Sequence, residues 1–298
     1  MKKRILVVGA NGFIGRYMMN KLVADATCIV TGCSLHHDIL PNSGNYHFME
    51  ADITVHASIL HMFEEVRPDV VINTSALSSP NYCDTHHEEA DALNIHAVEA
   101  MAEECEKYGS RLIHLSTDFV FKGDVNKLYT EDDELSPVNY YGITKMESEK
   151  AVSKTSSNYA IARVVVVYGK PFDGQHGNIV TLVANRLRNK EEICVVDDQW
   201  RTPTFVCDVV DGINRLINHH ANGIYHICGG ESISISELAF RVADVFGLDS
   251  SLIIPMSTAE MNEKVARPRY SSLSIEKARR ELGYNPHSLE EGIKNIEL

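Results

Sequence analysis

The sequence predicts an α/β protein with a doubly wound parallel sheet and a smaller, mainly C-terminal lobe. Through the first two thirds of the chain, short and continuously apolar runs alternate with stretches of helical period, which is the pattern of parallel strands joined by crossover helices. A glycine-rich turn follows the first apolar run. After Gly169 the elements become shorter and lie between loops that contain glycine and proline, which predicts the second lobe.

The individual elements can be placed from their patterns. Helical spacing is seen in "HASILHMFEEV" and in "EEADALNIHAVEAMAEECEKYG", where Gly109 suits the position just after a helix end. Serine followed three residues later by glutamate predicts two late helix starts, at Ser234 and at Ser288. The expected strands, buried on both faces, are residues 4–8, 27–30, 69–73, 111–116 and 160–169.

Composition excludes several classes of function. The formal net charge of −13 argues against a nucleic-acid or anionic-membrane partner, because such binding depends on clustered Lys and Arg. The seven cysteines form no C-x-x-C pair and an odd number cannot all pair, so we expect a reducing cytoplasm and buried apolar thiols. The apolar run of the opening "MKKRILVVGANG" stops at Gly9, too short for a signal peptide or a membrane span. The histidines show no metal-ligand spacing, so no metal is expected.

The glycine-rich turn predicts a dinucleotide site. Gly9, Gly12 and Gly15 in "VVGANGFIG" connect the first strand to the first helix. Glycines at such positions allow a tight turn and the close approach of a pyrophosphate to the amides of a helix N-terminus. We therefore expect a Rossmann-type domain. The alternative is a tight turn that binds nothing.

The spacing G-x-x-G-x-x-G introduces a family resemblance. Together with Asp52-Ile53, Asn73 and Tyr141-x-x-x-Lys145, this turn resembles the extended short-chain dehydrogenases/reductases. Within that superfamily, "STDFVF", "YTEDDELSPVNYYGITKMESE", "VVDDQWRTPTFVCDV", "GIYHICGGESISISELA" and "RPRYSSLSIEKARRELGY" are similar to the dTDP-4-dehydrorhamnose reductase family. The resemblance covers nearly the whole chain.

Tyr141 and Lys145 give this resemblance its chemistry. The two residues are one helical turn apart and so share a face. A free tyrosine has a pKa of about 10, and a nearby ammonium lowers it by favouring the phenolate. Tyr141 could then protonate a carbonyl oxygen while hydride reaches the carbon. The resemblance implies that Lys145 also holds the nicotinamide ribose and that Thr117 offers its hydroxyl to the same oxygen.

The resemblance further implies a division of the chain and two sets of ligand contacts. Residues 1–169, completed by 203–229, would bind NAD(P), and residues 170–202 and 230–298 would bind the substrate. Guanidinium groups suit a diphosphate, although a surface arginine is the alternative. The implied cofactor residues are Gly9, Asn11, Gly12, Phe13, Ile14, Gly15, Asp52, Ile53, Asn73, Ser75, Tyr141 and Lys145. The implied substrate residues are Asp118, Val166, Asn178, Trp200, Arg201 and Arg267.

The choice of cofactor depends on the tip of the second strand. An acidic residue there would bind the ribose 2′-hydroxyl and select NAD. The tip reads "TGCSLHHD", which lacks an acid at the expected place and offers Ser34 or His36, with Arg16, for a 2′-phosphate. We expect NADP(H) rather than NAD(H).

Two further residues, Tyr140 and Asn94, are candidates for the site. Tyr140 is a rival to Tyr141 as the acid, but Thr144 rather than a lysine stands four residues on, so Tyr140 is expected to pack or to contact substrate. Asn94 lies inside a predicted helix, where an amide is a poor helix former. It is either an interior polar support for the site or a surface residue.

Three functions remain open. The first is reduction of a nucleotide-linked 4-keto-6-deoxysugar, such as dTDP-4-dehydrorhamnose, by a cytoplasmic enzyme that is expected to be a homodimer. The second is a sugar-nucleotide epimerase or dehydratase, although Asp118-Phe119 stands where dehydratases carry an Asp-Glu pair. The third is a non-catalytic regulator resembling the β subunit of methionine adenosyltransferase.

One departure from the family concerns the substrate. The family's Arg-x-x-Trp-Val-Tyr-Gly string reads here from Arg163 to Gly169 with Val166 in place of the tryptophan. An aromatic surface expected against the substrate is therefore missing. Trp200, the only tryptophan, is expected to replace it.

Overall fold

The computed structural model describes residues 2–39, 46–219 and 222–296. These residues form two compact units. The first comprises Met1–Thr117, Asn139–Ala162 and Ile213–Tyr225, and the second comprises Asp118–Val138, Arg163–Gly212 and His226–Leu298. The division expected from the sequence counted residues 118–138 with the first lobe, whereas this segment belongs to the second unit.

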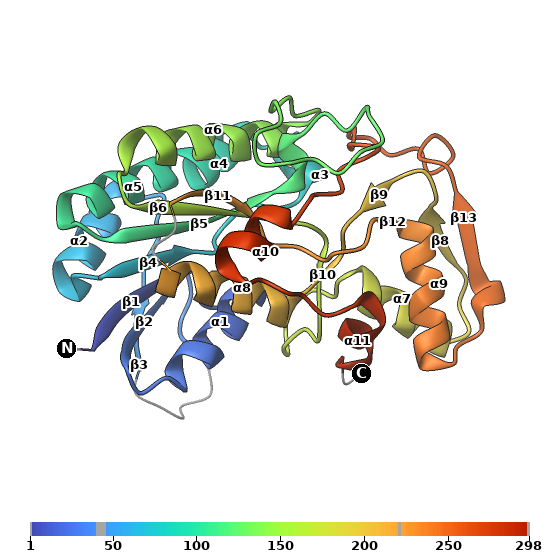
Figure 1. Cartoon of the computed structure of the whole chain (residues 1–298), viewed down its shortest axis with the longest axis horizontal. Coiled ribbons are helices and arrows are strands. Elements are labelled where there is room, and N and C mark those ends of the chain that lie inside the picture. Colours follow the sequence, from blue (N-terminus) through green and yellow to red (C-terminus); the bar gives the residue numbers. More distant parts are fainter. Residues whose placement is uncertain (1, 40–45, 220–221, 297–298) are drawn as a thin grey trace. The chain divides into compact units, whose positions relative to one another are not determined.

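The first unit contains a seven-stranded sheet with strand order β11-β6-β5-β4-β1-β2-β3 (Figure 1). Its strands are β1 (Lys3–Val8), β2 (Cys28–Ser34), β3 (Tyr46–Glu50), β4 (Val70–Asn73), β5 (Arg111–Thr117), β6 (Tyr159–Val164) and β11 (Gly223–His226). The pairs β1–β2, β2–β3, β1–β4 and β4–β5 are parallel. The predicted fold class, a doubly wound α/β sheet of the Rossmann type, is confirmed.

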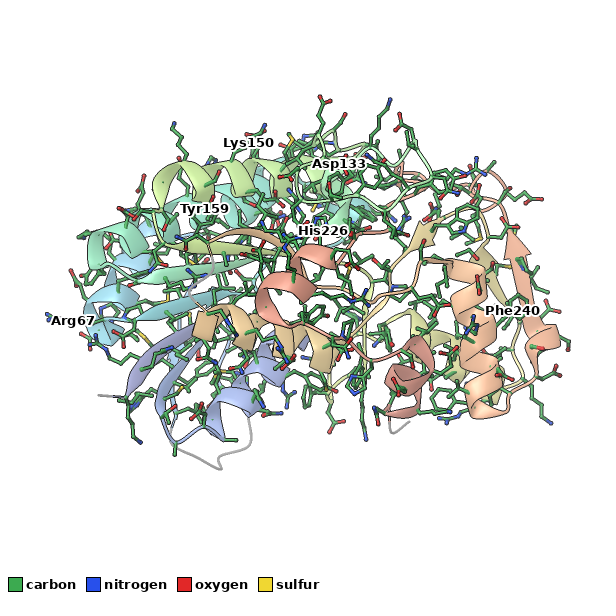
Figure 2. All side chains as sticks on the ribbon, viewed as in Figure 1. Arg67, Asp133, Lys150, Tyr159, His226 and Phe240 are labelled. Carbon is green, nitrogen blue, oxygen red and sulfur yellow. The ribbon has the colours of Figure 1, made fainter. Side chains whose placement is uncertain are left out.

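Helices cover both faces of this sheet (Figure 1). The core is formed by fully buried strand residues such as Leu6 and Leu112, against which Ile59, Phe63 and Met101 pack. Gly109 ends α5 with φ of +67°, as its position in the sequence predicts. Lys150 stands on the solvent-exposed face of α6 (Figure 2). The helices of this unit are α1 (Phe13–Val23), α2 (His56–Val66), α3 (Pro80–Cys83), α4 (His87–Asp91), the π-helix η1 (Ala92–His96), α5 (Ala97–Tyr108) and α6 (Tyr140–Thr155), and α8 (Val206–His219) contributes its second half.

The strand expected over residues 160–169 is interrupted. It is divided into β6 and the short β7 (Val167–Tyr168), with Val165 and Val166 between them. Val166 has a φ of +38°, a left-handed conformation that is strained for a β-branched residue. After this bend, β7 pairs with β10 (Thr204–Phe205) in the second unit. The apolar run therefore serves two different sheets, which its composition could not reveal.

The second unit is built from short strand pairs and helices. Besides β7–β10, the strand β8 (Ile193–Val196) pairs with β13 (Ile253–Met256), and β9 (Trp200–Arg201) pairs with β12 (Ile233–Ser234). Its other helices are α7 (Ile179–Arg188), α9 (Ile235–Phe246), α10 (Glu276–Leu282) and α11 (Leu289–Lys294), with short 3₁₀ turns at Asp118–Val120 and Ser250–Leu252. Both predicted helix starts are observed, because Ser234 and Ser288 accept hydrogen bonds from the N–H groups of Glu237 and Glu291.

The cysteines only partly match the expectation. All seven are free thiols. Cys33, Cys83, Cys105 and Cys228 are buried, but Cys194 and Cys207 are exposed and Cys28 is half-buried. The reading of every cysteine as a buried apolar thiol was therefore wrong for these three. Among the described residues, no helix is long and apolar enough to cross a membrane, and no group of His, Cys, Asp and Glu is arranged to hold a metal ion.

Candidate active site

The glycine-rich turn is shaped by close backbone contacts. Gly9 has a φ of +82°, and a Cβ placed on it would lie 2.7 Å from Thr74 Oγ1 and 2.8 Å from the Ser75 backbone nitrogen. A Cβ on Gly15 would lie 2.0 Å from the carbonyl oxygen of Gly9. Gly12 is the N-cap of α1 and supplies no side-chain cap to it. The turn therefore brings the start of α1 against the ends of two strands, as a dinucleotide site requires.

A cavity of about 490 Å³ opens beside this turn. It is lined by residues that end or follow β1, β2, β3 and β4, so it lies at the carboxyl ends of the strands, where the strand order reverses. Its size, its position and the glycine turn fit a nicotinamide dinucleotide. The lining residues are Val8, Gly9, Gly12, Cys33, Ser34, Leu35, Ala51, Asp52, Ile53, Thr54, Thr74, Ser75, Ala76, Leu77, Glu89, Ala92 and Leu93.

The cavity takes in some of the expected cofactor residues and leaves out others. Gly9, Gly12, Asp52, Ile53 and Ser75 line it, whereas the other members of the expected set do not. Asn73 holds one of the lining residues, because its Oδ1 accepts from the backbone N–H of Ser75 at 3.0 Å. The Asn11 side-chain amide donates to the carbonyl oxygens of His36 and His37, at 3.2 and 2.9 Å, which ties the glycine turn to the segment after β2. The expected residues outside the lining are Asn11, Phe13, Ile14, Gly15, Asn73, Tyr141 and Lys145.

Tyr141 and Thr117 are presented by regular elements. Tyr141 lies half-buried in the first turn of α6, which Asn139 caps by accepting from the Gly142 N–H at 2.9 Å. Thr117 is the last residue of β5 and is 6% exposed. The helix α6 packs against β5, and the two elements are linked by the contact of Lys145 with His114.

Lys145 is buried one turn after Tyr141. It is 1% exposed, and its Nζ lies 3.0 Å from Nε2 of His114, a fully buried residue of β5. Burial lowers the pKa of Lys145 to about 8, although the carboxylate of Glu149 opposes this shift. Burial, and then the charge of Lys145, holds the pKa of His114 well below its usual range, so this imidazole is neutral.

Tyr140 and Asn94 are engaged elsewhere. The Tyr140 hydroxyl donates to the carboxylate of Asp91 at 2.9 and 3.0 Å, and its ring stacks on His87 at 3.6 Å. Burial, followed by the hydrogen bond to Asp91, raises the pKa of Tyr140. Asn94 is fully buried in η1, where its amide bonds both backbone polar groups of Leu77 and donates to Thr144 Oγ1 at 3.0 Å. Asn94 is therefore an interior polar support, and its surface reading was wrong.

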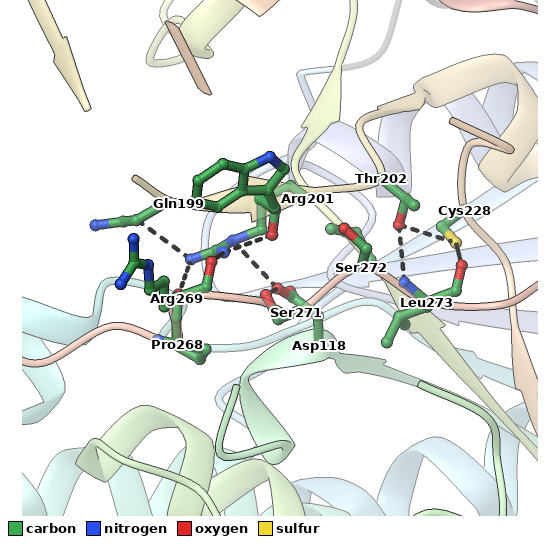
Figure 3. Close-up of polar contacts among 12 residues, drawn as sticks. Asp118, Gln199, Arg201, Thr202, Cys228, Pro268, Arg269, Ser271, Ser272 and Leu273 are labelled. Atoms are coloured by element: carbon green, nitrogen blue, oxygen red, sulfur yellow. Dashed lines mark hydrogen bonds and ion pairs between the residues drawn. The ribbon is translucent and has the colours of Figure 1, made fainter. Parts of the chain in front are cut away.

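In the second unit, Arg201 is surrounded by protein acceptors (Figure 3). It is 2% exposed, and its Nε lies 3.5 Å from the carboxylate of the equally buried Asp118. Ser271 Oγ donates to the same carboxylate. The other guanidinium nitrogens donate to Pro268 O (2.7 Å), Trp200 O (2.8 Å), Gln199 Oε1 (3.2 Å) and Arg269 O (3.4 Å). The guanidinium expected to hold a diphosphate therefore stabilises three segments of the unit itself, and it is not a surface charge.

The residues expected to bind the substrate do not all line one cavity. A cavity of about 260 Å³ is lined by Val166, Arg201 and Arg267, together with Phe119, Ile179, Cys194, Val195, Val196, Gln199, Ile235, Met261 and Glu263. Arg267 pairs there with Glu263 at 3.0 Å. Trp200 lies outside this lining and stacks on Tyr270 at 5.0 Å. Asn178 caps α7, and its amide donates to the carbonyl of Gly169 at 2.7 Å.

Sequence reasoning missed His114. The signal available was a histidine within the apolar run "LIHL" of an expected strand, where a buried polar group needs partners. Its partners lie 41 positions upstream and 31 positions downstream, at Asn73 and Lys145, so no local pattern could identify them.

Comparison with known proteins assigns the family. The model of the RmlD substrate binding domain matches residues 2–297. The chain is 32% identical to the spore coat polysaccharide biosynthesis protein SpsK of Bacillus subtilis (strain 168), covering 80% of this chain and 81% of that protein. It is 29% identical to methionine adenosyltransferase 2 subunit beta of Danio rerio, covering 91% of this chain and 82% of that protein.

Solved structures agree with this assignment. The dTDP-4-dehydrorhamnose reductase of Bacillus anthracis str. Ames, in complex with NADP, superimposes with a TM-score of 0.85 at 28% identity, covering 99% of each chain. The chain therefore belongs to the RmlD family of NAD(P)-dependent oxidoreductases, the dTDP-4-dehydrorhamnose reductase family that its motifs resemble.

Proposed function

We propose that the chain reduces a nucleotide-linked 4-keto-6-deoxysugar, with dTDP-4-dehydrorhamnose as the first candidate and dTDP-rhamnose as the product. The observation that carries the proposal is the burial of Lys145 one turn after Tyr141, in the same unit as the glycine turn and its cavity. A buried lysine at this spacing has no structural need that a leucine would not meet better.

The reaction divides between the cofactor and the side chains. A bound nicotinamide supplies hydride to the carbonyl carbon. Tyr141 Oη donates its proton to the carbonyl oxygen, so the carbonyl becomes a secondary alcohol and the tyrosine is left as a phenolate. The Lys145 charge stabilises that phenolate, and the Thr117 hydroxyl donates to the same oxygen. Tyr140 is unsuited to the role because its hydroxyl already donates to Asp91.

NADP(H) is the cofactor that we infer. Ser34, at the end of β2, lines the cavity, and the nearest downstream carboxylate, Asp38, accepts a hydrogen bond from Tyr46 at 2.8 Å and lies outside the lining. No carboxylate from this segment therefore lines the cavity in the described residues to repel a 2′-phosphate. The B. anthracis reductase was solved with NADP. The homodimer stays a prediction, which sedimentation equilibrium tests.

Two alternatives to reduction are a regulatory role and dehydratase chemistry. The relatedness to methionine adenosyltransferase 2 subunit beta, at 29% identity, is as strong as that to the B. anthracis reductase at 28%, so identity does not choose between regulation and catalysis. The intact Thr117, Tyr141 and Lys145 favour catalysis. Asp118 is bonded to Ser271 and Arg201, which leaves it poorly placed for the acid–base role of a dehydratase.

The test is oxidation of NADPH across a panel of dTDP-, UDP- and GDP-linked 4-ketosugars. We expect turnover with at least one dTDP-linked ketosugar, and a kcat that is lower by roughly 10² or more after Tyr141→Phe at equal cofactor saturation. Turnover with none of the panel, by a protein that binds NADPH, would favour the regulator. Conversion of a nucleotide-linked 4-hydroxy sugar to its 4-epimer, without net oxidation or reduction of the nicotinamide, would favour the epimerase.

A further inference from the structure

A chain of hydrogen bonds fixes the side chain of Asn73, at the end of β4. The backbone N–H of Ser75 donates to Asn73 Oδ1 at 3.0 Å, and the Ser75 hydroxyl donates to the same oxygen at 2.6 Å. A backbone N–H can only donate, so the amide oxygen must face Ser75 and the amide nitrogen must face away. Asn73 Nδ2 then points at His114 Nδ1, 3.2 Å distant.

This orientation selects the tautomer of His114. Because the amide nitrogen donates, Nδ1 must accept, and the neutral imidazole carries its hydrogen on Nε2. Ser148 gives independent support. Its hydroxyl lies 3.1 Å from His114 Nε2 but donates its own hydrogen to the Lys145 carbonyl at 2.8 Å, so an oxygen lone pair is left to accept from Nε2. Both neighbours of the ring therefore require the Nε2–H form.

The tautomer of His114 affects the protonation of Lys145. Within the described residues, His114 Nε2 is the one polar partner of the Lys145 Nζ. An ammonium has three donors and no acceptor, so it would face an N–H with its own N–H groups, whereas a neutral amine could accept from Nε2. Glu149, 2% exposed and one turn further along α6, is the charged group that opposes this effect. Among the elements packed on α6, β5 supplies His114 and η1 supplies the neutral Asn94 to Thr144. Titratable groups of the other elements have partners of their own: Asp91 of α4 accepts from Tyr140, Cys83 of α3 donates to the Leu77 carbonyl, and Glu104 of α5 pairs with Lys107.

We propose that His114 is a positioning residue: its fixed tautomer denies the Lys145 ammonium an acceptor in the cofactor-free protein, and Lys145 takes up a proton when a bound ribose offers it hydroxyl oxygens. The inference rests on the proposed function only in assuming that a nicotinamide dinucleotide binds. Binding and proton uptake are then linked. The lowered pKa of Lys145, about 8, places the linkage in an accessible range.

The first measurement is calorimetry of NADPH binding at pH 8 in two buffers of different ionisation enthalpy, without ketosugar. We expect uptake of about half a proton per chain, because a group is half protonated when the pH equals its pKa. The dissociation constant of NADPH should rise towards about tenfold per pH unit above pH 8, as expected for one linked proton. Lys150→Met is the matched control, since Lys150 is on the same helix, exposed and paired with Glu147, and it should leave the uptake unchanged. Uptake near zero in the wild type would overturn the proposal.

The second measurement is the tautomer itself, by ¹⁵N NMR of the histidine rings, with His114 assigned from the signal lost in His114→Gln. We expect hydrogen on Nε2, none on Nδ1, and no titration from pH 6 to 9. Asn73→Asp supplies the informative variant. Its carboxylate still accepts from Ser75 but also accepts from Nδ1–H, so the hydrogen should move to Nδ1, Nε2 should accept from the ammonium, and proton uptake should fall several-fold.

The outcomes separate this inference from the proposed function. Hydrogen on Nδ1 in the wild type, or unchanged proton uptake in an Asn73→Asp protein whose tautomer has moved, would overturn the role of His114 even if ketosugars are reduced. Proton uptake as expected without turnover of any ketosugar would leave the role of His114 standing and remove the proposed substrate. Absence of NADPH binding would remove both.

Discussion

Replacing Arg201 by methionine is the sharpest test of how the second unit is held together. Methionine keeps much of the side-chain length and loses the charge and every hydrogen bond. Asp118, 3% exposed, would lose the cation 3.5 Å away, and acceptors from two further segments, residues 199–200 and 268–269, would lose their donors. Removing one partner of a buried ion pair costs about 3–5 kcal/mol, because the remaining charge is left without compensation. We expect the free energy of unfolding of the variant to fall by an amount in this range.

The assay is urea denaturation monitored by the fluorescence of Trp200, the only tryptophan, which belongs to the same unit. Arg267→Met is the matched control, because the Arg267 side chain is 31% exposed and Glu263 is its one acidic partner among the described residues. The ion pair of Arg267 with Glu263 is partly open to solvent. We therefore expect the free energy of unfolding of Arg267→Met to fall by about 1 kcal/mol or less. The double variant Asp118→Asn with Arg201→Met should recover part of the lost stability, since no buried charge remains.

A different result would contradict this reasoning. One such result is a free energy of unfolding of Arg201→Met within about 1 kcal/mol of the wild-type value, together with a KM for the ketosugar that rises tenfold or more. The guanidinium would then bind the substrate diphosphate, and the contacts in Figure 3 would contribute little to stability. If both effects are found in a folded protein at low urea, Arg201 serves both purposes.

Three further predictions concern the first unit and its ligands. Tyr141→Phe should keep NADPH affinity while kcat falls by roughly 10² or more, the usual contribution of a general acid, and retained turnover would move the acid to Tyr140 or Thr117. NADPH should bind at least as tightly as NADH in titrations of nicotinamide fluorescence, and a clear NADH preference would contradict the reading of the β2 tip. Gly15→Ala should raise the dissociation constant of NADPH at least tenfold, because its Cβ would lie 2.0 Å from the Gly9 carbonyl oxygen. Its control is Gly109→Ala, whose Cβ meets nothing within 4 Å. The left-handed backbone there should lower the free energy of unfolding by about 1 kcal/mol, and the affinity for NADPH should not change.

The features that the sequence determined by itself are local in the chain. Five strands could be placed because residues buried on both faces of a parallel sheet must be apolar along their whole length. The glycine turn could be placed because only glycine tolerates the approach of Gly9 to Thr74 and of Gly15 to Gly9. Tyr141 and Lys145 share a face of α6 because of the helical repeat alone.

The features that only the tertiary structure decided depend on residues far apart in sequence. The bend at Val166 follows from the pairing of β7 with β10, about 37 positions later, which outweighs the strand preference of a valine run. Arg201, expected from the sequence to hold a diphosphate, is buried because segments near residues 118 and 268 surround it. The protonation of Lys145 depends on a ring 31 positions away, whose tautomer is fixed from another strand. Burial and hydrogen-bond direction decide such properties, and both exist only once distant segments have packed together.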